Sequence, residues 1–128
     1  FNYCFQSNSA LTEIDADLNF SSSSAVSNAF NGCTALTSIR FVPNTTKASL
    51  TLTPCTALSA ESLVSVANGL QDGRSYVTLK LSTESKALAD EIMGIVSTGE
   101  GVNTFTVSES GDVSLSDFIT DEKGWTLA

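Results

Sequence analysis

The chain has 128 residues, enough for one domain with its own core, and 41% of them are hydrophobic, as in globular rather than disordered proteins. Its 14 acidic and 6 basic residues give a net charge of −8, which argues against nucleic acid as a partner because Lys and Arg must neutralise phosphates. The apolar runs are too short for insertion in a membrane. Because the chain begins at Phe1 with no Met and no signal peptide, we interpret it as a fragment or mature portion of a longer protein.

Residues 1–58 are built from units that repeat about every 25 residues. SALTEI at 9–14 matches TALTSI at 34–39, and CTAL at 33–36 returns at 55–58. Each unit is expected to hold a turn with an aromatic residue, a tight turn such as Asn31–Gly32, and an L-x-x-I-x-F strand. One unit cannot bury its apolar side alone, so the units are predicted to stack and to align Phe5 over Phe30, Leu11 over Leu36 and Ile14 over Ile39.

Residues 59–128 are predicted to continue a strand–helix alternation that begins with a strand at Leu50–Leu52. Ser59 is a typical N-cap for a helix to about Leu70, with Leu63, Val66, Ala67 and Leu70 on one face. The later elements are expected to be a strand at 76–81, with Val77, Leu79 and Leu81 on one face, and a helix at 84–96 capped by Thr83, with Leu88, Ile92 and Ile95 inward. A strand at 104–107, a helix at 115–123, a C-cap at Gly124 and a strand at 125–127 complete the prediction.

We interpret this second part as the continuation and closure of a curved sheet, because the last coil of a stack otherwise exposes its core. Trp125 is expected to pack in that core, and a sugar-stacking role for its ring is the alternative. The whole chain is thus predicted to be one domain, with repeat units at 1–58 and a helix–strand continuation and cap at 59–128.

The three cysteines, Cys4, Cys33 and Cys55, cannot all be joined in disulfides because their number is odd. Their spacing does not match C-x-x-C metal sites, and the chain has no His to complete a mixed site. We predict small buried thiols, with Cys33 and Cys55 aligned between units. A Cys4–Cys33 disulfide is the alternative if the protein is secreted.

The pattern F-x-x-C-x-x-L-x-x-I-x-F at residues 30–41 resembles the BspA-type leucine-rich repeat, and Lys123-Gly124-Trp125-Thr126 is similar to a frequent C-terminal ending of that family. The resemblance covers about residues 1–58, while residues 94–120 do not repeat. It implies an α/β fold: a short leucine-rich-repeat-like solenoid with a curved sheet, helices or turns on the other side, and a C-terminal α/β cap. The family occurs on bacterial cell surfaces, especially in gut and oral species, and in phage or prophage tail-associated proteins.

No set of residues in the sequence predicts catalysis, so we expect no enzyme, no cofactor and no metal. The absence of His removes Ser–His and Cys–His nucleophile pairs. The carboxylates of Asp90-Glu91 and of Asp121-Glu122 are adjacent in sequence and should diverge on helices. Residues 15–19 resemble the start of a calcium loop, D-x-D-x-N, but the Gly and the acidic residue that must follow are missing, so a solvated turn after the strand is expected.

The predicted function is non-catalytic recognition of a protein or glycan by a module of a bacterial cell-surface or secreted protein. Its ligand would lie on a host or bacterial surface. Alternating polar residues of the first two strands are expected to make the contacts: Thr12, Glu13 and Asp15, then Thr37, Ser38 and Arg40. The alternatives are a phage or prophage tail-associated structural or receptor-binding module in the virion, and a purely structural spacer.

Overall fold

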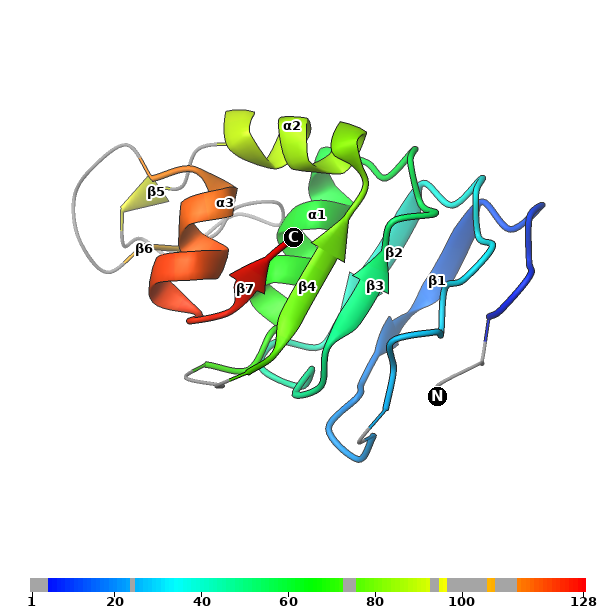
Figure 1. The fold of residues 1–128 in the computed structure, drawn as a ribbon, viewed down its shortest axis with the longest axis horizontal. Coiled ribbons are helices and arrows are strands. Elements are labelled where there is room, and N and C mark those ends of the chain that lie inside the picture. The colour runs from blue at the N-terminus through cyan, green and yellow to red at the C-terminus, as the bar shows by residue number, and fades with distance from the viewer. Residues whose placement is uncertain (1–4, 24, 73–75, 93–94, 97–105, 108–112) are drawn as a thin grey trace.

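The computed structural model describes residues 5–23, 25–72, 76–92, 95–96, 106–107 and 113–128. Within these residues the fold is mixed α/β, with small parallel sheets, three α-helices and no closed barrel (Figure 1). None of the helices in these ranges is long and apolar enough to cross a membrane.

The first sheet pairs β1 (Glu13–Leu18) with β2 (Ser38–Phe41) in parallel. Glu13 is opposite Ser38 and Leu18 is opposite Phe41, with a bulge between Glu13 and Asp17. The Phe5 and Phe30 rings stack with centroids 5.5 Å apart, which confirms that pair of the predicted alignment. Leu11, Leu36, Ile14 and Ile39 all belong to the same hydrophobic core.

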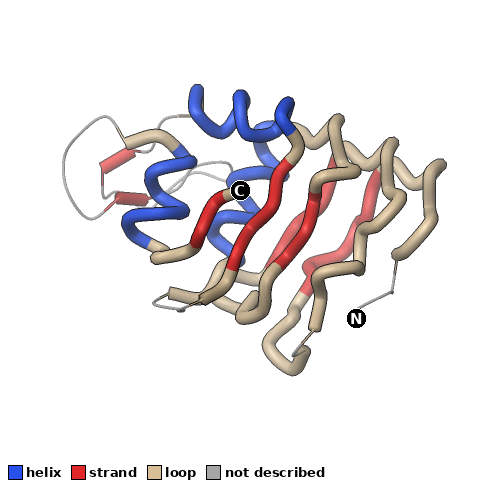
Figure 2. The backbone as a smooth tube through the Cα atoms, viewed as in Figure 1, coloured by secondary structure: helices blue, strands red, loops and turns tan. Residues whose placement is uncertain are grey.

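The remaining strands lie in two further sheets, so the prediction of one continuous curved sheet is wrong for the described residues. The central sheet has the order β3–β4–β7, built from Leu50–Leu52, Thr78–Leu81 and Thr126–Leu127. A third pairs β5 (Ile95–Val96) with β6 (Thr106–Val107). The tube in Figure 2 shows the helices gathered at the end of the molecule away from β1.

Helix α1 (Ala60–Gly69) forms where it was predicted. Ser59 is its N-cap, and the Ser59 hydroxyl accepts a hydrogen bond from Ser62 N. The predicted face is buried, and so are Ser62 and Val64, because α1 has neighbours on more than one side. A Cβ at Gly69 would lie 2.7 Å from Phe41 Cβ, so glycine is what lets α1 approach β2 closely.

Helix α2 (Thr83–Glu91) differs from the prediction at both ends. Its N-cap is Ser82, whose hydroxyl accepts from Ser85 N, rather than Thr83. The helix ends at Glu91 rather than 96, because Ile92 is extended, and Ile95 belongs to β5. The predicted inward residues Leu88 and Ile92 are half-buried, and the buried residues of α2 are Ser85 and Ala89.

The C-terminal elements follow the prediction closely. Helix α3 (Leu115–Asp117), with the capping residue Ser114, runs directly into the π-helical turn η1 (Phe118–Glu122). Gly124 has a φ of 75°, which suits the predicted C-cap, and β7 pairs with β4. Tyr76, predicted at the start of a strand, lies outside β4 with a φ of 61° and is fully exposed. Val77, Leu79 and Leu81 are buried as predicted.

Cys33 and Cys55 are buried free thiols, as predicted. The Cys33 thiol donates a hydrogen bond to Phe5 O at 3.0 Å. Burial raises the pKa of Cys33, and burial together with the neighbouring Cys33 raises the pKa of Cys55 to about 12. Both thiols are therefore protonated at neutral pH. Cys4, and with it the alternative Cys4–Cys33 disulfide, lies outside the described residues.

Candidate binding surface on the first two strands

The six residues predicted to contact a ligand lie together on β1 and β2. Glu13, Asp15 and Arg40 are exposed strand residues, and Ser38 is half-buried opposite Glu13. Thr12 and Thr37 immediately precede the two strands and are exposed. They are joined, since the Thr37 amide and hydroxyl donate to Thr12 O at 2.8 Å and 2.9 Å.

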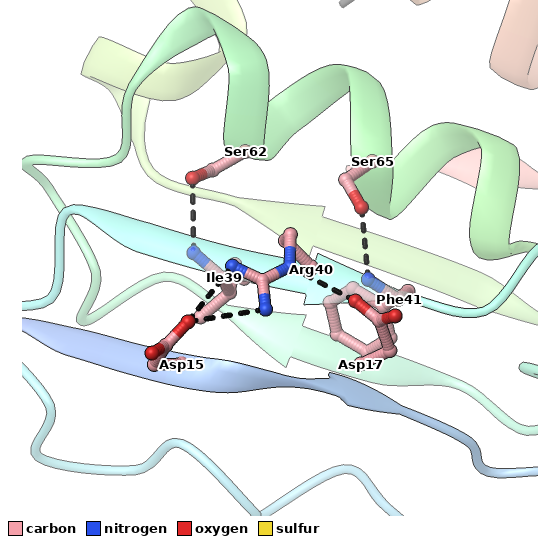
Figure 3. Close-up of polar contacts among 7 residues, drawn as sticks. All are labelled: Asp15, Asp17, Ile39, Arg40, Phe41, Ser62 and Ser65. Carbon is pink, nitrogen blue, oxygen red and sulfur yellow. Dashed lines mark hydrogen bonds and ion pairs between the residues drawn. The ribbon is translucent and has the colours of Figure 1, made fainter. Parts of the chain in front are cut away.

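Arg40 holds two carboxylates of β1. Its Nε donates to Asp17 Oδ1 at 2.9 Å, and a terminal nitrogen lies 3.2 Å from Asp15 Oδ1 (Figure 3). These contacts, first with Asp17 and then with Asp15, raise the pKa of the Arg40 guanidinium, which stays charged. We call these three residues the Arg40 cluster; its formal charge is −1.

Asp17 also belongs to this surface and was not predicted from the sequence. The signal was present, because Asp15 and Asp17 are two positions apart and alternate residues of a strand share a face. The interpretation of residues 15–19 as a solvated turn is wrong for Asp15 to Leu18, which belong to β1. A turn does follow, where Asn19 Oδ1 accepts a hydrogen bond from Ser21 N.

On its other side, β2 is held by side chains of α1 rather than by another strand. The Ser62 hydroxyl accepts from Ile39 N and donates to Thr37 O, both at 3.0 Å. The Ser65 hydroxyl accepts from Phe41 N at 2.8 Å (Figure 3). Ser62 thus makes, with one side chain, the two hydrogen bonds that a backbone residue of a neighbouring parallel strand would make. The helix therefore ends this sheet at β2.

A second basic residue, Lys123, is buried at the C-terminal end. Its ammonium lies 2.9 Å from Asn44 Oδ1 and 3.0 Å from Asp72 Oδ1, and 5.7 Å from the centre of the Phe118 ring. We call Lys123, Asn44 and Asp72 the Lys123 cluster. The Lys123 cluster joins the C-cap of η1 to the two distant loops that contain Asn44 and Asp72.

Trp125 is buried beside this cluster, and its indole Nε1 donates to Gln71 O at 2.9 Å. This confirms the core-packing prediction, and a ring that is 2% exposed offers no platform for a sugar. Each residue of the K-G-W-T segment has a structural role. Lys123 is a buried cation, Gly124 forms a left-handed backbone turn, Trp125 packs in the core and Thr126 pairs with β4.

In the ranges that the structure describes, no three residues of the His, Cys, Asp and Glu types gather as they would around a metal ion. The side chain of Asp90 accepts a hydrogen bond from the Ser116 hydroxyl, which joins α2 to α3. Glu91 and Asp121 are exposed. The Asp90–Ser116 hydrogen bond therefore has a structural role in linking two helices. The polar surface of β1 and β2 is a better candidate for a functional site than these carboxylates.

No protein-family model, no curated protein and no solved structure matches this chain. The function is therefore inferred from the residues described above.

Proposed function

We propose that the protein is a non-catalytic recognition module that binds a protein or glycan through the exposed polar surface of β1 and β2. The observation that carries this proposal is the grouping of the six residues Thr12, Glu13, Asp15, Thr37, Ser38 and Arg40 on two adjacent, paired strands. A polar surface on a rigid frame keeps its side chains in place before a ligand arrives, which lowers the entropy lost on binding.

We also propose that the chain is a short leucine-rich-repeat-like solenoid of the BspA type with a C-terminal cap. Hydrogen bonds between equivalent places in successive units support this: Thr12 with Thr37, Ile39 with Ser62 and Phe41 with Ser65 are 23 to 25 residues apart. In such a solenoid each unit contacts mainly its neighbours, and α1 takes the position of the next strand in the stack.

The proposed location is the bacterial cell surface or the extracellular space, with the ligand on a host or bacterial surface. Exposed polar side chains on strands, including one Arg and several carboxylates, suit hydrogen bonding to glycan hydroxyls or to polar protein surfaces. A phage or prophage tail module is the second candidate, and the same experiment separates the two.

The experiment measures binding of the fluorescently labelled protein to mucus-coated epithelial cells and to a panel of gut bacteria. A surface variant carries T12A, E13Q, D15N, T37A, S38A and R40Q. A matched control variant carries E84Q, K86Q and E91Q, which alter exposed residues of α2 and remove two acids and one base, as the surface variant does. Circular dichroism checks that both variants keep the fold.

Saturable binding to the epithelial surface that is lost only in the surface variant is the result expected of an adhesin. Selective binding to certain bacteria, lost in the same variant, favours the phage or interbacterial role. Binding to neither surface, or equal binding by all three proteins, overturns the proposed site and leaves the chain as a structural spacer.

A further inference from the structure

We infer that the outer face of the β3–β4–β7 sheet is a second binding site, and that it takes a sugar that carries a carboxylate. The inference goes beyond the proposed function, because this face and the polar surface of β1 and β2 belong to different sheets. We call it the β4 face, and its residues are Lys47, Thr51, Tyr76, Thr78, Lys80 and Thr126.

The β4 face is the polar side of a sheet whose other side packs in the core. The core side is lined by four buried leucines: Leu50, Leu52, Leu79 and Leu81. Alternate residues of a strand lie on opposite sides, so the residues between these leucines form the outer face. Parallel pairing puts Thr51 beside Lys80 and Thr78 beside Thr126. β4 lies between β3 and β7 (Figure 1), so described strands flank the face on both sides.

The β4 face is basic, although the whole chain has a net charge of −8. Its three strands contain no Asp or Glu, and Lys80 is exposed on the central strand. Thr78 N donates to Ser49 Oγ at 2.9 Å, across an offset of 29 residues that also pairs β3 with β4. The same offset places Lys47 level with Tyr76. Two ammonium groups on strands without carboxylates favour an anionic partner.

Tyr76, immediately before β4, is the aromatic residue of this face. In the part of the chain that the structure describes, it is the one large hydrophobic side chain that is exposed. Its φ of 61° lies in the left-handed region, which is unfavourable for most residues other than glycine. A fully exposed ring adds nothing to the packing of the core. An exposed tyrosine in a strained conformation is typical of a binding residue.

A sugar with an acidic group matches these features. The Tyr76 ring offers an apolar surface to the C–H groups of a sugar ring, and threonine hydroxyls both donate and accept hydrogen bonds with sugar hydroxyls. Lys47 and Lys80 supply the positive charge for the carboxylate. An acidic peptide fits less well, because peptides are typically bound at a strand edge or in a groove, and β4 has a strand on each side.

The test follows the amide signals of the isotopically labelled protein by NMR during titration with sialyllactose. The control ligands are lactose, which lacks the carboxylate, and hexaglutamate, which lacks the sugar. The variants are K80Q, Y76G and Y76F. K86Q is the matched control for K80Q, since it changes an exposed lysine of α2.

We expect saturable shifts around β3, β4 and β7 with sialyllactose, weakened by added salt, and much weaker binding of both control ligands. K80Q should weaken binding about 2- to 5-fold, the range for one exposed charge pair, while K86Q should leave it unchanged. Y76G should weaken binding at least about fivefold, as expected for an aromatic binding residue, and Y76F should bind nearly as well as the unaltered protein.

The stability of Y76G separates binding from a structural role of the tyrosine. Glycine adopts a positive φ without strain, so Y76G should unfold at the same or a higher urea concentration than the unaltered protein. A clearly lower urea concentration would show that Tyr76 has a structural role and would overturn the inference. Equal binding of lactose and sialyllactose, tighter binding of hexaglutamate, or unchanged binding by Y76G would overturn it as well.

These outcomes are separable from those of the proposed function, because the surface variant keeps every residue of the β4 face. If the surface variant binds sialyllactose and the unaltered protein binds neither kind of cell, only the proposed function is removed. If the protein binds cells but not sialyllactose, and Y76G binds the cells equally well, only this inference is removed.

Discussion

The Arg40 cluster and the Lys123 cluster use similar groups in opposite surroundings. In each, one basic side chain meets two oxygen-bearing side chains at 2.9–3.2 Å. The Arg40 side chain is 47% exposed, whereas that of Lys123 is 7% exposed. The contrast lies in the basic side chain, since the carboxylates of Asp17 and Asp72 are exposed alike, at 67% and 68%. Arg40 joins two adjacent strands, and Lys123 joins parts of the chain 79 residues apart.

Because of this difference in burial, we expect the Arg40 cluster to matter for binding and the Lys123 cluster to matter for stability. An exposed ion pair is screened by water, so the Arg40 cluster should contribute little to stability. A buried ammonium without partners is costly, so the Lys123 cluster holds the C-terminal elements in one position. Substitutions in the buried C-terminal region should therefore affect stability more than substitutions in the Arg40 cluster.

The largest effect is expected from W125A, at the buried end. The substitution removes a fully buried ring and the hydrogen bond to Gln71 O. We expect the free energy of unfolding to fall by about 4 kcal/mol. Because Trp125 is the one Trp of the chain, unfolding in urea should be followed by circular dichroism rather than fluorescence. W125F keeps most of the packing and should lose less than half as much.

The second prediction removes the partners of Lys123. In N44A/D72A the buried ammonium loses both of its side-chain oxygens, which should cost about 3 kcal/mol. Adding K123M to that variant removes the unpaired charge while keeping the apolar stem. The triple variant should therefore be more stable than N44A/D72A. If it is less stable, the charge is not what the cluster compensates.

The third prediction concerns the link between the exposed surface and the core. In S62A, the Ile39 amide and the Thr37 carbonyl lose the Ser62 hydroxyl inside the protein. We expect a loss of about 2 kcal/mol and faster hydrogen exchange at Ile39 N. E61Q, at the exposed neighbouring position, is the control and should change stability little. An unchanged exchange rate in S62A would mean that α1 does not hold this edge.

The smallest effect on stability is expected from R40Q. Breaking both exposed ion pairs should lower the free energy of unfolding less than any of the substitutions above, because water screens them. The cost should shrink further in 1 M NaCl, where the screening length is about 3 Å, whereas the effect of N44A/D72A should persist. A double-mutant cycle with D17N measures the Arg40–Asp17 coupling. A coupling that is unchanged by salt and as large as the effect of N44A/D72A would contradict the proposed contrast between the clusters.

Elements set by short-range patterns were predictable. Ser59 and the apolar face of α1 lie within one stretch of chain, and the 25-residue repeat predicted the stacking of Phe5 on Phe30 correctly. The end of α2 was predicted too late, because Ile92 and Ile95 continue an apolar helical pattern. Gly94 lies between them, and a glycine at this place is a signal for the end of a helix. Asp17 was not predicted to belong to the surface because residues 15–19 were interpreted as a turn, whereas Asp15 to Leu18 belong to β1.

The sequence by itself determined the local elements, the apolar positions and the grouping of polar residues on β1 and β2, because periodicity and capping act over a few residues. Only the tertiary structure decided the partners of those elements. That Ser62 and Ser65 replace a strand beside β2, and that Lys123 reaches Asn44 and Asp72, depends on which distant segments the packing brings together. The side chains of serine and lysine can form hydrogen bonds with many different groups. Which partner each one contacts therefore depends on the tertiary geometry, which no local sequence pattern shows.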